Sequence, residues 1–436
     1  MRNRQRRLAF GVVTAVFAAT ALAGCVTGGD DPDPDPVDSA DPGSSDTAEP
    51  VTLDFPNFQA AEAPFSTWWD EFIEAFEAEY PNVTVEVSSA PNSAALAETL
   101  VTRFAANDPP SVVQETTAQF AKFASAGNFR GIDDLLADTN VPDSWGPLQE
   151  TYMWEGETQG VMTLASGLIL YYNEKLLDDA GVDVPTTAEE LVEAAEAVFD
   201  PDNGIYGFVG VSAPQDTKLY NEPSAFVVGQ GGQWYDGNQP NFTDPAVIDA
   251  LEIYRRVMAT APPGLQHTQR NTIFQSGQGA FMIENANFTG AIRTEAPADV
   301  LPFLKAAPVP FEIEPGLASV FLAIPSGIEG AELEAAENFV RMAVSSEWQL
   351  RYAEIIGAPA PDPESAATLA EDDPQMAMFA ELGSEAISVY PTSPAILAKL
   401  PEFNKSMFDA MVSVSSSSRP IAEIMAELQS EIEAQL

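Results

Sequence analysis

Residues 168–191 read LILYYNEKLLDDAGVDVPTTAEEL, and this stretch does most to decide the fold. The apolar residues 167–172 at its start are typical of a buried strand. Residues 174–180 then predict a short helix that ends at Gly181, because glycine readily takes the left-handed conformation that closes a helix. A strand that leads directly into a helix is a building unit of an α/β fold.

The second half of the stretch predicts another helix, over residues 188–199. Thr187 can accept a hydrogen bond from the first turn of this helix, and Glu190 occupies the reciprocal position of a capping box. We expect Tyr171 and Tyr172, which end the strand, to pack in the core under the sheet rather than to contact a ligand.

The same alternation of strand and helix patterns extends along the chain from residue 51. Strands are expected at 51–55, 83–87 and 111–114, and helices at 65–80, 94–106, 118–126, 245–260, 332–345 and 420–435. The fold class is therefore α/β, and about 385 residues after residue 50 predict two domains.

Further short segments follow residues 172–191 in a definite order. They are 205–208 (IYGF), 231–232 (GG), 274–282 (FQSGQGAFM), 307–310 (APVP), 323–327 (AIPSG), 335–339 (AAENF), 345–347 (SSE) and 357–359 (GAP). As a series, they resemble the extracellular solute-binding proteins of bacterial ABC importers, in the carbohydrate-type group (family 1) that includes maltose-binding protein. Within the series, Gly277 and Gly279 are expected to supply turn geometry.

The resemblance implies a two-lobed periplasmic-binding-protein fold of the hinge-closing type (type II) with discontinuous lobes. Lobe 1 would combine residues 51–166 and 309–344, and lobe 2 would combine residues 167–308 and 345–436. The chain would cross between the lobes near Ser166, near Pro308 and near Val344–Ser345. A bound solute would then close the lobes about this hinge.

The first 25 residues predict export. Four arginines precede an apolar run that is too short to be trusted as a membrane span, so residues 1–24 are typical of a signal peptide. Leu22-Ala23-Gly24-Cys25 resembles the lipobox of bacterial lipoproteins, in which cleavage makes the cysteine the lipidated first residue. Cys25 is the only cysteine, and the Asp-Pro repeats of residues 25–50 predict a disordered acidic linker.

Charge narrows the range of partners. The chain has 66 Asp and Glu against 19 Lys and Arg, for a net charge of −47. Such a surface repels phosphate backbones and anionic lipid headgroups, so nucleic acid is a poor candidate partner. Solubility explains the charge better than a binding role for the acidic residues does, although metal or cationic ligands remain an alternative.

Motifs for catalysis are missing from the sequence. His267 is the only histidine and is expected to be a surface residue; no Gly-x-Ser-x-Gly elbow, P-loop or His-Glu-x-x-His is present. The acidic residues could always supply a carboxylate pair for glycoside hydrolysis, so that signal has almost no specificity. We expect no enzyme activity, no metal and no cofactor. The rival hypotheses are a secreted glycan hydrolase and a solute-sensing or adhesive lipoprotein of the same fold.

The ligand is expected beyond the carboxyl ends of the strands, where open α/β sheets bind their ligands. Amide, carboxylate and aromatic side chains in those loops suit the paired hydroxyls and C–H faces of sugars. Trp69 fits the buried face of its helix better than a ligand site. The predicted ligand-binding residues are Gln59, Trp68, Gln114, Glu115, Gln119, Ser166, Tyr220, Asn221, Glu222, Asn287 and Phe288, with Asn57 and Phe58 beside the first of them.

Two departures from the family pattern weaken the carbohydrate assignment. Ser111 stands where family members often have an aspartate, and Asn287-Phe288 stands where sugar binders commonly have a tryptophan. The resemblance implies a lipid-anchored, monomeric receptor at the outer face of the cytoplasmic membrane. It would deliver a small polar solute to ABC permease subunits with a separate ATPase. A sugar or oligosaccharide is favoured over a peptide, a polyamine or another polar metabolite.

Overall fold

The computed structural model describes residues 49–214, 216, 218–371, 373–391 and 393–436, which belong to one compact unit. The predicted signal peptide, Cys25 and the acidic linker lie outside the described residues. Across the described ranges, no helix combines the length and apolar character needed to span a bilayer.

The chain begins with a parallel strand pair, as the strand–helix–strand pattern predicts. β1 (Val51–Asn57) pairs with β2 (Val83–Ser89), and α1 (Phe65–Glu79) connects them. Four aromatic side chains of α1 at helical spacing are buried: Trp68, Trp69, Phe72 and Phe76. This apolar face explains why the helix packs on the core, since burying large aromatic surfaces is strongly favourable.

A seven-stranded mixed sheet forms the centre of the unit. Its strand order is β13-β12-β6-β10-β7, with β11 also paired to β6 and β3 also paired to β12. The strands are β3 (Val113–Thr116), β6 (Val161–Asn173), β7 (Tyr206–Phe208), β10 (Gly279–Asn285), β11 (Leu304–Pro308), β12 (Pro315–Ala323) and β13 (Ile387–Ser388). The predicted strand at 167–172 is thus part of a much longer one, β6.

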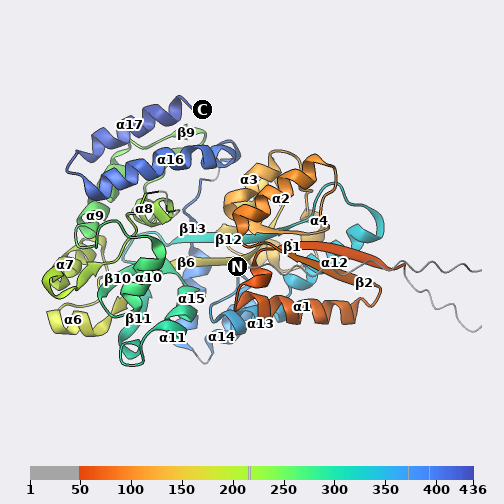
Figure 1. Ribbon diagram of the computed structural model, residues 1–436, viewed down its shortest axis with the longest axis horizontal. Helices are drawn as coiled ribbons and strands as arrows, with labels where there is room; N and C mark the ends of the chain where they lie inside the picture. Colours follow the sequence, from red (N-terminus) through yellow and green to blue (C-terminus); the bar gives the residue numbers. More distant parts are fainter. Residues whose placement is uncertain (1–48, 215, 217, 372, 392) are drawn as a thin grey trace, which may run out of the picture. The chain divides into compact units, whose positions relative to one another are not determined.

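β6 changes its partner halfway along its length. Its first half pairs with β12 as far as Gly167, whereas its second half pairs with β10 from Leu168 onward. Figure 1 shows β6 and β12 between a group of helices that includes α7 and α9 and a group that includes α1 and α2. The partner change falls beside Ser166, where the first crossing between lobes was predicted.

The third predicted crossing, near Val344–Ser345, falls between two helices that both contact α1. α12 (Gly330–Ala343) is followed by α13 (Ser346–Ile356), and α13 still packs on α1. Trp348 of α13 meets Phe72 edge-on with ring centroids 5.1 Å apart, and Arg351 pairs with Glu71 at 2.7 Å. These long-range contacts keep the chain on the α1 side for at least one more helix.

Of the remaining helices, α2, α3, α6, α7, α9 and α17 lie where the periodicity predicts them, with ends that differ by a few residues, and the others, including the longest helix of the described chain, were not predicted. The remaining helices are α2 (Ser93–Ala105), α3 (Thr117–Ala124), α4 (Asp133–Leu136), α5 (Val141–Ser144), α6 (Glu174–Ala180), α7 (Ala188–Val198), α8 (Lys218–Gly229), α9 (Pro245–Met258), α10 (His267–Gln275), α11 (Phe288–Glu295), α14 (Pro363–Ala370), α15 (Pro374–Glu385), α16 (Pro394–Ser416) and α17 (Ile421–Glu433). Two small hairpins are β4 (Met153–Trp154) with β5 (Glu157–Thr158), and β8 (Tyr235–Asp236) with β9 (Gln239–Pro240).

The hydrogen bonds that cap the start of α7 match the predicted capping box except for one donor. Oγ1 of Thr187 accepts from the N–H of Glu190 at 3.2 Å, as predicted. The Glu190 carboxylate instead accepts from the N–H of Thr186 at 2.8 Å, one residue before the predicted partner. Both hydrogen bonds therefore stabilise the start of α7, but the bond accepted by Glu190 comes from Thr186 instead of Thr187.

Gly277 and Gly279, in the segment 274–282, are each required for a different reason. Gly277 has φ +80°, so the prediction of turn geometry is confirmed. The same prediction is wrong for Gly279, which lies in β10: a Cβ there would stand 2.9 Å from a methyl group of Val209. Close packing, rather than a turn, explains this second glycine.

Candidate functional site

Polar side chains from β1, β3 and the loop after β1 form the first part of the site. Nε2 of Gln114 donates to Oε1 of Gln59 at 2.6 Å. Oδ1 of Asn57 accepts from the N–H groups of Gln59 at 2.7 Å and Ala60 at 3.2 Å. These bonds fix the loop after β1 against β3, so the amide groups have set orientations before any ligand arrives.

Three polar atoms of this first part have no hydrogen-bond partner among the described residues. They are Nδ2 of Asn57, Oε1 of Gln114 and Oε2 of Glu115, and all three are shielded from solvent. Buried polar groups in native proteins are nearly always paired, with protein, water or ligand. These three atoms lie at the strand ends where the ligand is expected, in side chains that are buried in this structure.

Glu115 is the titratable group of this first part. Its Oε1 accepts from the hydroxyl of Ser93 and, at 2.7 Å, from the N–H of Thr116. Burial raises the pKa of Glu115 to about 7, because removal from water disfavours the charged form more than these hydrogen bonds favour it. The side chain can therefore be a carboxylate or a carboxylic acid within the physiological pH range.

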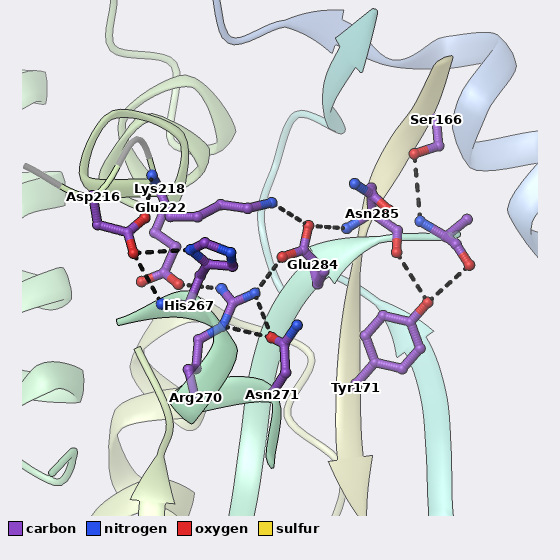
Figure 2. A network of polar contacts seen from close by, with 11 residues as sticks. Ser166, Tyr171, Asp216, Lys218, Glu222, His267, Arg270, Asn271, Glu284 and Asn285 are labelled. Carbon is purple, nitrogen blue, oxygen red and sulfur yellow. Dashed lines mark hydrogen bonds and ion pairs between the residues drawn. The ribbon is translucent and has the colours of Figure 1, made fainter. Parts of the chain in front are cut away.

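The end of β10 supplies a second part of the site. Oη of Tyr171 contacts the carbonyl oxygens of Asn285 and Ala286, each at 3.1 Å, and Oγ of Ser166 accepts from the N–H of Ala286 at 3.4 Å. Figure 2 shows these side chains converging on the turn that follows Asn285. Oδ1 of Asn287, the next residue, is shielded from solvent and has no described partner. The buried Tyr171 is thus a core residue that holds the turn, as predicted.

Tyr390 is a candidate site residue that the sequence reasoning missed. Its ring stacks on the predicted Tyr220, with centroids 5.5 Å apart and planes within 9°. Burial raises the pKa of Tyr390 to about 12, and a hydrogen bond with Asn221 opposes this shift. The alternation Ile-Ser-Val-Tyr before Pro391 could have identified a strand end here, because it follows the strand period of two.

A buried ion network lies behind the second part of the site. Arg270 contacts the carboxylates of both Glu222 and Glu284, and Nζ of Lys218 pairs with Glu284 at 2.6 Å (Figure 2). Burial opposes the charged form of Glu284, but Lys218 and Arg270 outweigh it and lower the pKa of Glu284 to about 2. Two basic and two acidic side chains thus join α8, α10 and β10, and burial raises the pKa of Glu222 while its neighbours lower that of Glu284.

The network changes the interpretation of Glu222. Its Oε1 contacts Arg270 and its Oε2 accepts from the N–H of Val211 at 2.8 Å, so both oxygens have partners within the protein. Glu222 therefore holds neighbouring segments together in this structure. Sequence gave no signal for this pairing, because Arg270 lies 48 positions further along the chain.

Two predicted aromatic residues are largely part of the core. Trp68 is 1% exposed, and its Nε1 donates to the carbonyl of Trp348 at 3.1 Å, so in this structure its side chain packs in the core. Trp69 is buried as expected. Phe288 is 6% exposed and meets the ring of Tyr171 edge-on at 5.5 Å, which leaves little of its face for a solute.

The other predicted residues are placed as follows. Gln119 is half-buried on α3, near the end of β3, and Phe58 is half-buried beside Gln59. His267 is a surface residue, as expected, with Nδ1 at 3.0 Å from Oδ2 of Asp216. In the portion of the chain that the structure describes, no cluster of histidine, cysteine and acidic side chains is arranged to hold a metal ion.

Comparison with known proteins identifies a family. The family model described as bacterial extracellular solute-binding protein matches residues 71–378. The maltotriose-binding protein of Pyrococcus abyssi is 24% identical over 224 residues, which are 50% of this chain and 46% of that protein. A putative binding protein of Brucella abortus is 24% identical over 264 residues, 58% of this chain and 62% of that protein. The chain thus spans about half to three fifths of the length of these curated relatives.

Solved structures share the fold at low identity. The GacH receptor of Streptomyces glaucescens, solved unliganded and with acarbose, has a TM-score of 0.74 at 21% identity, covering 89% of this chain and 99% of that chain. The sugar-binding protein MalE of Xanthomonas citri has a TM-score of 0.75 at 20% identity, covering 88% and 96%. UgpB of Mycobacterium tuberculosis, in complex with glycerophosphocholine, has a TM-score of 0.71 at 18% identity, covering 89% and 98%. The fold is therefore the two-lobed one that the resemblance implies.

Proposed function

Because the chain belongs to the family of bacterial extracellular solute-binding proteins, we propose that it is the solute receptor of an ABC importer. Its solute is a small, polar, hydroxyl-rich molecule, most simply a sugar or an oligosaccharide. The protein binds this solute without turnover and passes it to permease subunits that are driven by a separate ATPase.

The unpartnered polar atoms carry this proposal. Asn57 offers a donor, Gln114 and Asn287 offer acceptors, and Glu115 offers an acceptor or, when protonated, a donor. A hydroxyl donates one hydrogen bond and accepts others, so neighbouring hydroxyls of a sugar can satisfy such a mixed set. A polyamine would leave the Asn57 donor unpaired, and an apolar solute would leave all of these atoms unpaired.

Tyr390 adds an aromatic ring next to the predicted Tyr220 and Asn221. A flat ring held by stacking on Tyr220 loses little entropy when a solute packs against it. The combination of fixed amides with one aromatic ring favours a saccharide over a peptide.

Lobe closure is the proposed mechanism. We assign residues 51–166 and 309–356 to one lobe, moving α13 there because it packs on α1. The rest of the described chain, apart from the segments that cross between the lobes, forms the other lobe. A solute that contacts both lobes stabilises the closed state, because it interacts with that state more favourably than with the open one.

Export and anchoring complete the proposal. Lipidation at Cys25 would tether the receptor to the outer face of the cytoplasmic membrane, beside its permease. An acidic Asp-Pro linker after the tether would be self-repelling and extended, so the receptor could reach the transporter while staying attached to the lipid.

A thermal-shift screen of the purified chain tests the proposed function. The panel contains maltodextrins, monosaccharides, polyols, glycerophosphodiesters, amino acids and polyamines. A solute present at 100 times its Kd stabilises the native state by about 2.7 kcal/mol, which raises the melting temperature. We expect a saccharide or polyol to give this shift with one-to-one stoichiometry in calorimetry. Glycan cleavage, or no shift with any class, would overturn the proposal.

A further inference from the structure

The ion network behind the second part of the site reaches solvent at one side chain. Lys218 is 21% exposed, whereas Arg270, Glu222 and Glu284 are 0%, 3% and 7% exposed. Long basic side chains bury their stems and keep their charged ends accessible. A solute can therefore meet the ammonium group of Lys218, but it cannot reach the guanidinium group of Arg270.

Lys218 lies beside residues of the proposed solute site. It begins α8, the helix that also carries Tyr220, and it lines a small cavity of about 10 Å³ together with Asn221. Its Nζ donates to Oε1 of Glu284 at 2.6 Å, and the same oxygen accepts from the N–H of Asn285 at 3.0 Å (Figure 2). The ammonium group is thus next to the turn that forms the second part of the site.

A lysine without a counter-ion at this position would favour an anionic solute. Lysine commonly binds phosphate groups in proteins as a point charge. Opposite charges also attract each other more strongly in a partly buried site than in bulk water. The charge state of the acid that faces Lys218 therefore decides whether an anion gains by binding here.

Glu284 is that acid, and it stays charged. Burial opposes its ionised form, but Lys218 and Arg270 outweigh this effect and hold the pKa of Glu284 at about 2. The carboxylate therefore occupies the ammonium group throughout the physiological pH range. An entering phosphate or carboxylate would have to compete with this fixed anion and would be repelled by it.

The other basic side chains that act on candidate site residues also face acids. Arg293, whose charge reaches Tyr171, lies 3.6 Å from Asp373. Lys122 of α3 attracts the carboxyl group of Glu115. Within the described ranges, each basic group found to act on the site is thus accompanied by a carboxyl group.

We propose that Glu284 determines the charge selectivity of the solute site. By neutralising the ammonium group of Lys218, it makes the receptor select uncharged solutes over phosphorylated or carboxylated ones. This inference rests on the proposed function and narrows the solute to an uncharged polyhydroxy compound. The chain's net charge of −47 acts in the same direction, because it repels anions from the surface.

Calorimetric titration with inorganic phosphate tests the role of Glu284 before the solute is known. In about 150 mM NaCl, which screens distant charges, we expect no saturable binding to the parent chain. Glu284→Gln leaves Lys218 without its counter-ion, so this variant should bind phosphate saturably and at least about tenfold more tightly than the parent. Adding Lys218→Met should abolish the gain.

Glu189→Gln is the matched control. It frees Arg256, whose side chain is 43% exposed and distant from the proposed site in the sequence of contacts, so phosphate should not bind saturably. Saturable phosphate binding to the parent chain would overturn the proposal without recourse to any variant. The proposal also fails if Glu284→Gln, shown to be folded by its melting curve, binds phosphate no better than the parent.

This inference and the proposed function fail in different experiments. If no solute class raises the melting temperature, the proposed function fails, whereas the phosphate titration still shows whether Glu284 masks Lys218. Glucose, glucuronate and glucose 6-phosphate extend the thermal screen, and we expect the two anions to stabilise the parent chain less than glucose does. If either anion stabilises it more, the receptor function stands and the charge selectivity is overturned.

Discussion

Gln114 and Gln59, which are 55 positions apart, are joined by a hydrogen bond of 2.6 Å from Nε2 to Oε1. The bond links the end of β3 to the loop after β1, and it uses the donor of Gln114 while leaving its own Oε1 without a described partner. The direction of this bond therefore determines what the site offers a solute: an acceptor at Gln114, next to the carboxyl group of Glu115.

Replacement of Gln114 tests that arrangement. Gln114→Leu keeps the side-chain volume but removes the acceptor and leaves Oε1 of Gln59 unpaired. We expect roughly 10- to 100-fold weaker binding of the solute found by the thermal screen, equivalent to about 1.4–2.8 kcal/mol. Calorimetric titration measures the change. Gln375→Leu, a half-buried glutamine at the start of α15, is the control and should bind normally; equal losses in both variants would contradict the prediction.

Glu115 should make stability depend on pH. Its pKa is raised from 4.5 to about 7 in the folded protein, so the native state holds this proton more tightly than the unfolded state does. The stabilisation is present below pH 4.5 and is lost as the pH rises to about 7, because the unfolded state ionises first. The lost contribution is about 3 kcal/mol, at 1.36 kcal/mol for each pKa unit.

The measurement compares urea unfolding of the parent chain and Glu115→Gln between pH 4.5 and 8. The neutral variant lacks this titration, so the free energy of unfolding of the parent should fall relative to that of the variant across this range. A constant difference between the two proteins would show that the carboxyl group is not raised in pKa.

Arg270 should be essential to stability because it neutralises two buried carboxylates. Arg270→Met leaves Glu222 and Glu284 buried with only Lys218 nearby, and we expect the free energy of unfolding to fall by about 3–5 kcal/mol. Adding Glu222→Gln removes one of the unpaired charges and should restore part of the loss. Urea unfolding measures each step.

The control for this prediction is a surface pair of the same type. Arg256 contacts Glu189 at 2.7 Å with its side chain 43% exposed, so Arg256→Met should cost less than about 1 kcal/mol. Similar losses for Arg256→Met and Arg270→Met would show that the buried network contributes no more than an exposed ion pair.

Cys25 should determine where the protein is found. Cys25→Ala removes the proposed lipid attachment, so we expect the protein to move from the membrane fraction to the soluble exported fraction. Mass spectrometry of the processed parent chain should show a lipid-modified N-terminal cysteine. An unmodified Cys25 together with unchanged membrane association would contradict the lipoprotein assignment.

Where an element was predicted from the sequence, the prediction rested on the local periodicity of helices and strands. The stretch 168–191 contains an apolar strand, the left-handed Gly181 and the Thr187 cap, and each is recognisable within a few residues of its own position. Ordered family segments then identified the two-lobed fold. The candidate loops at the ends of β1, β3 and β10 followed from the rule that ligands bind beyond the carboxyl ends of strands.

Tertiary structure decided which of the predicted side chains are already paired or enclosed within the protein. Trp68 looked available on its helix but is enclosed by Trp348, 280 positions away, and the same packing keeps α13 on α1. Glu222 looked like a ligand contact but is paired with Arg270. Tyr390 became a candidate site residue only because its ring stacks on that of Tyr220. Periodicity is a local property that the sequence carries, whereas burial and pairing depend on residues distant in the chain, which only the folded protein brings together.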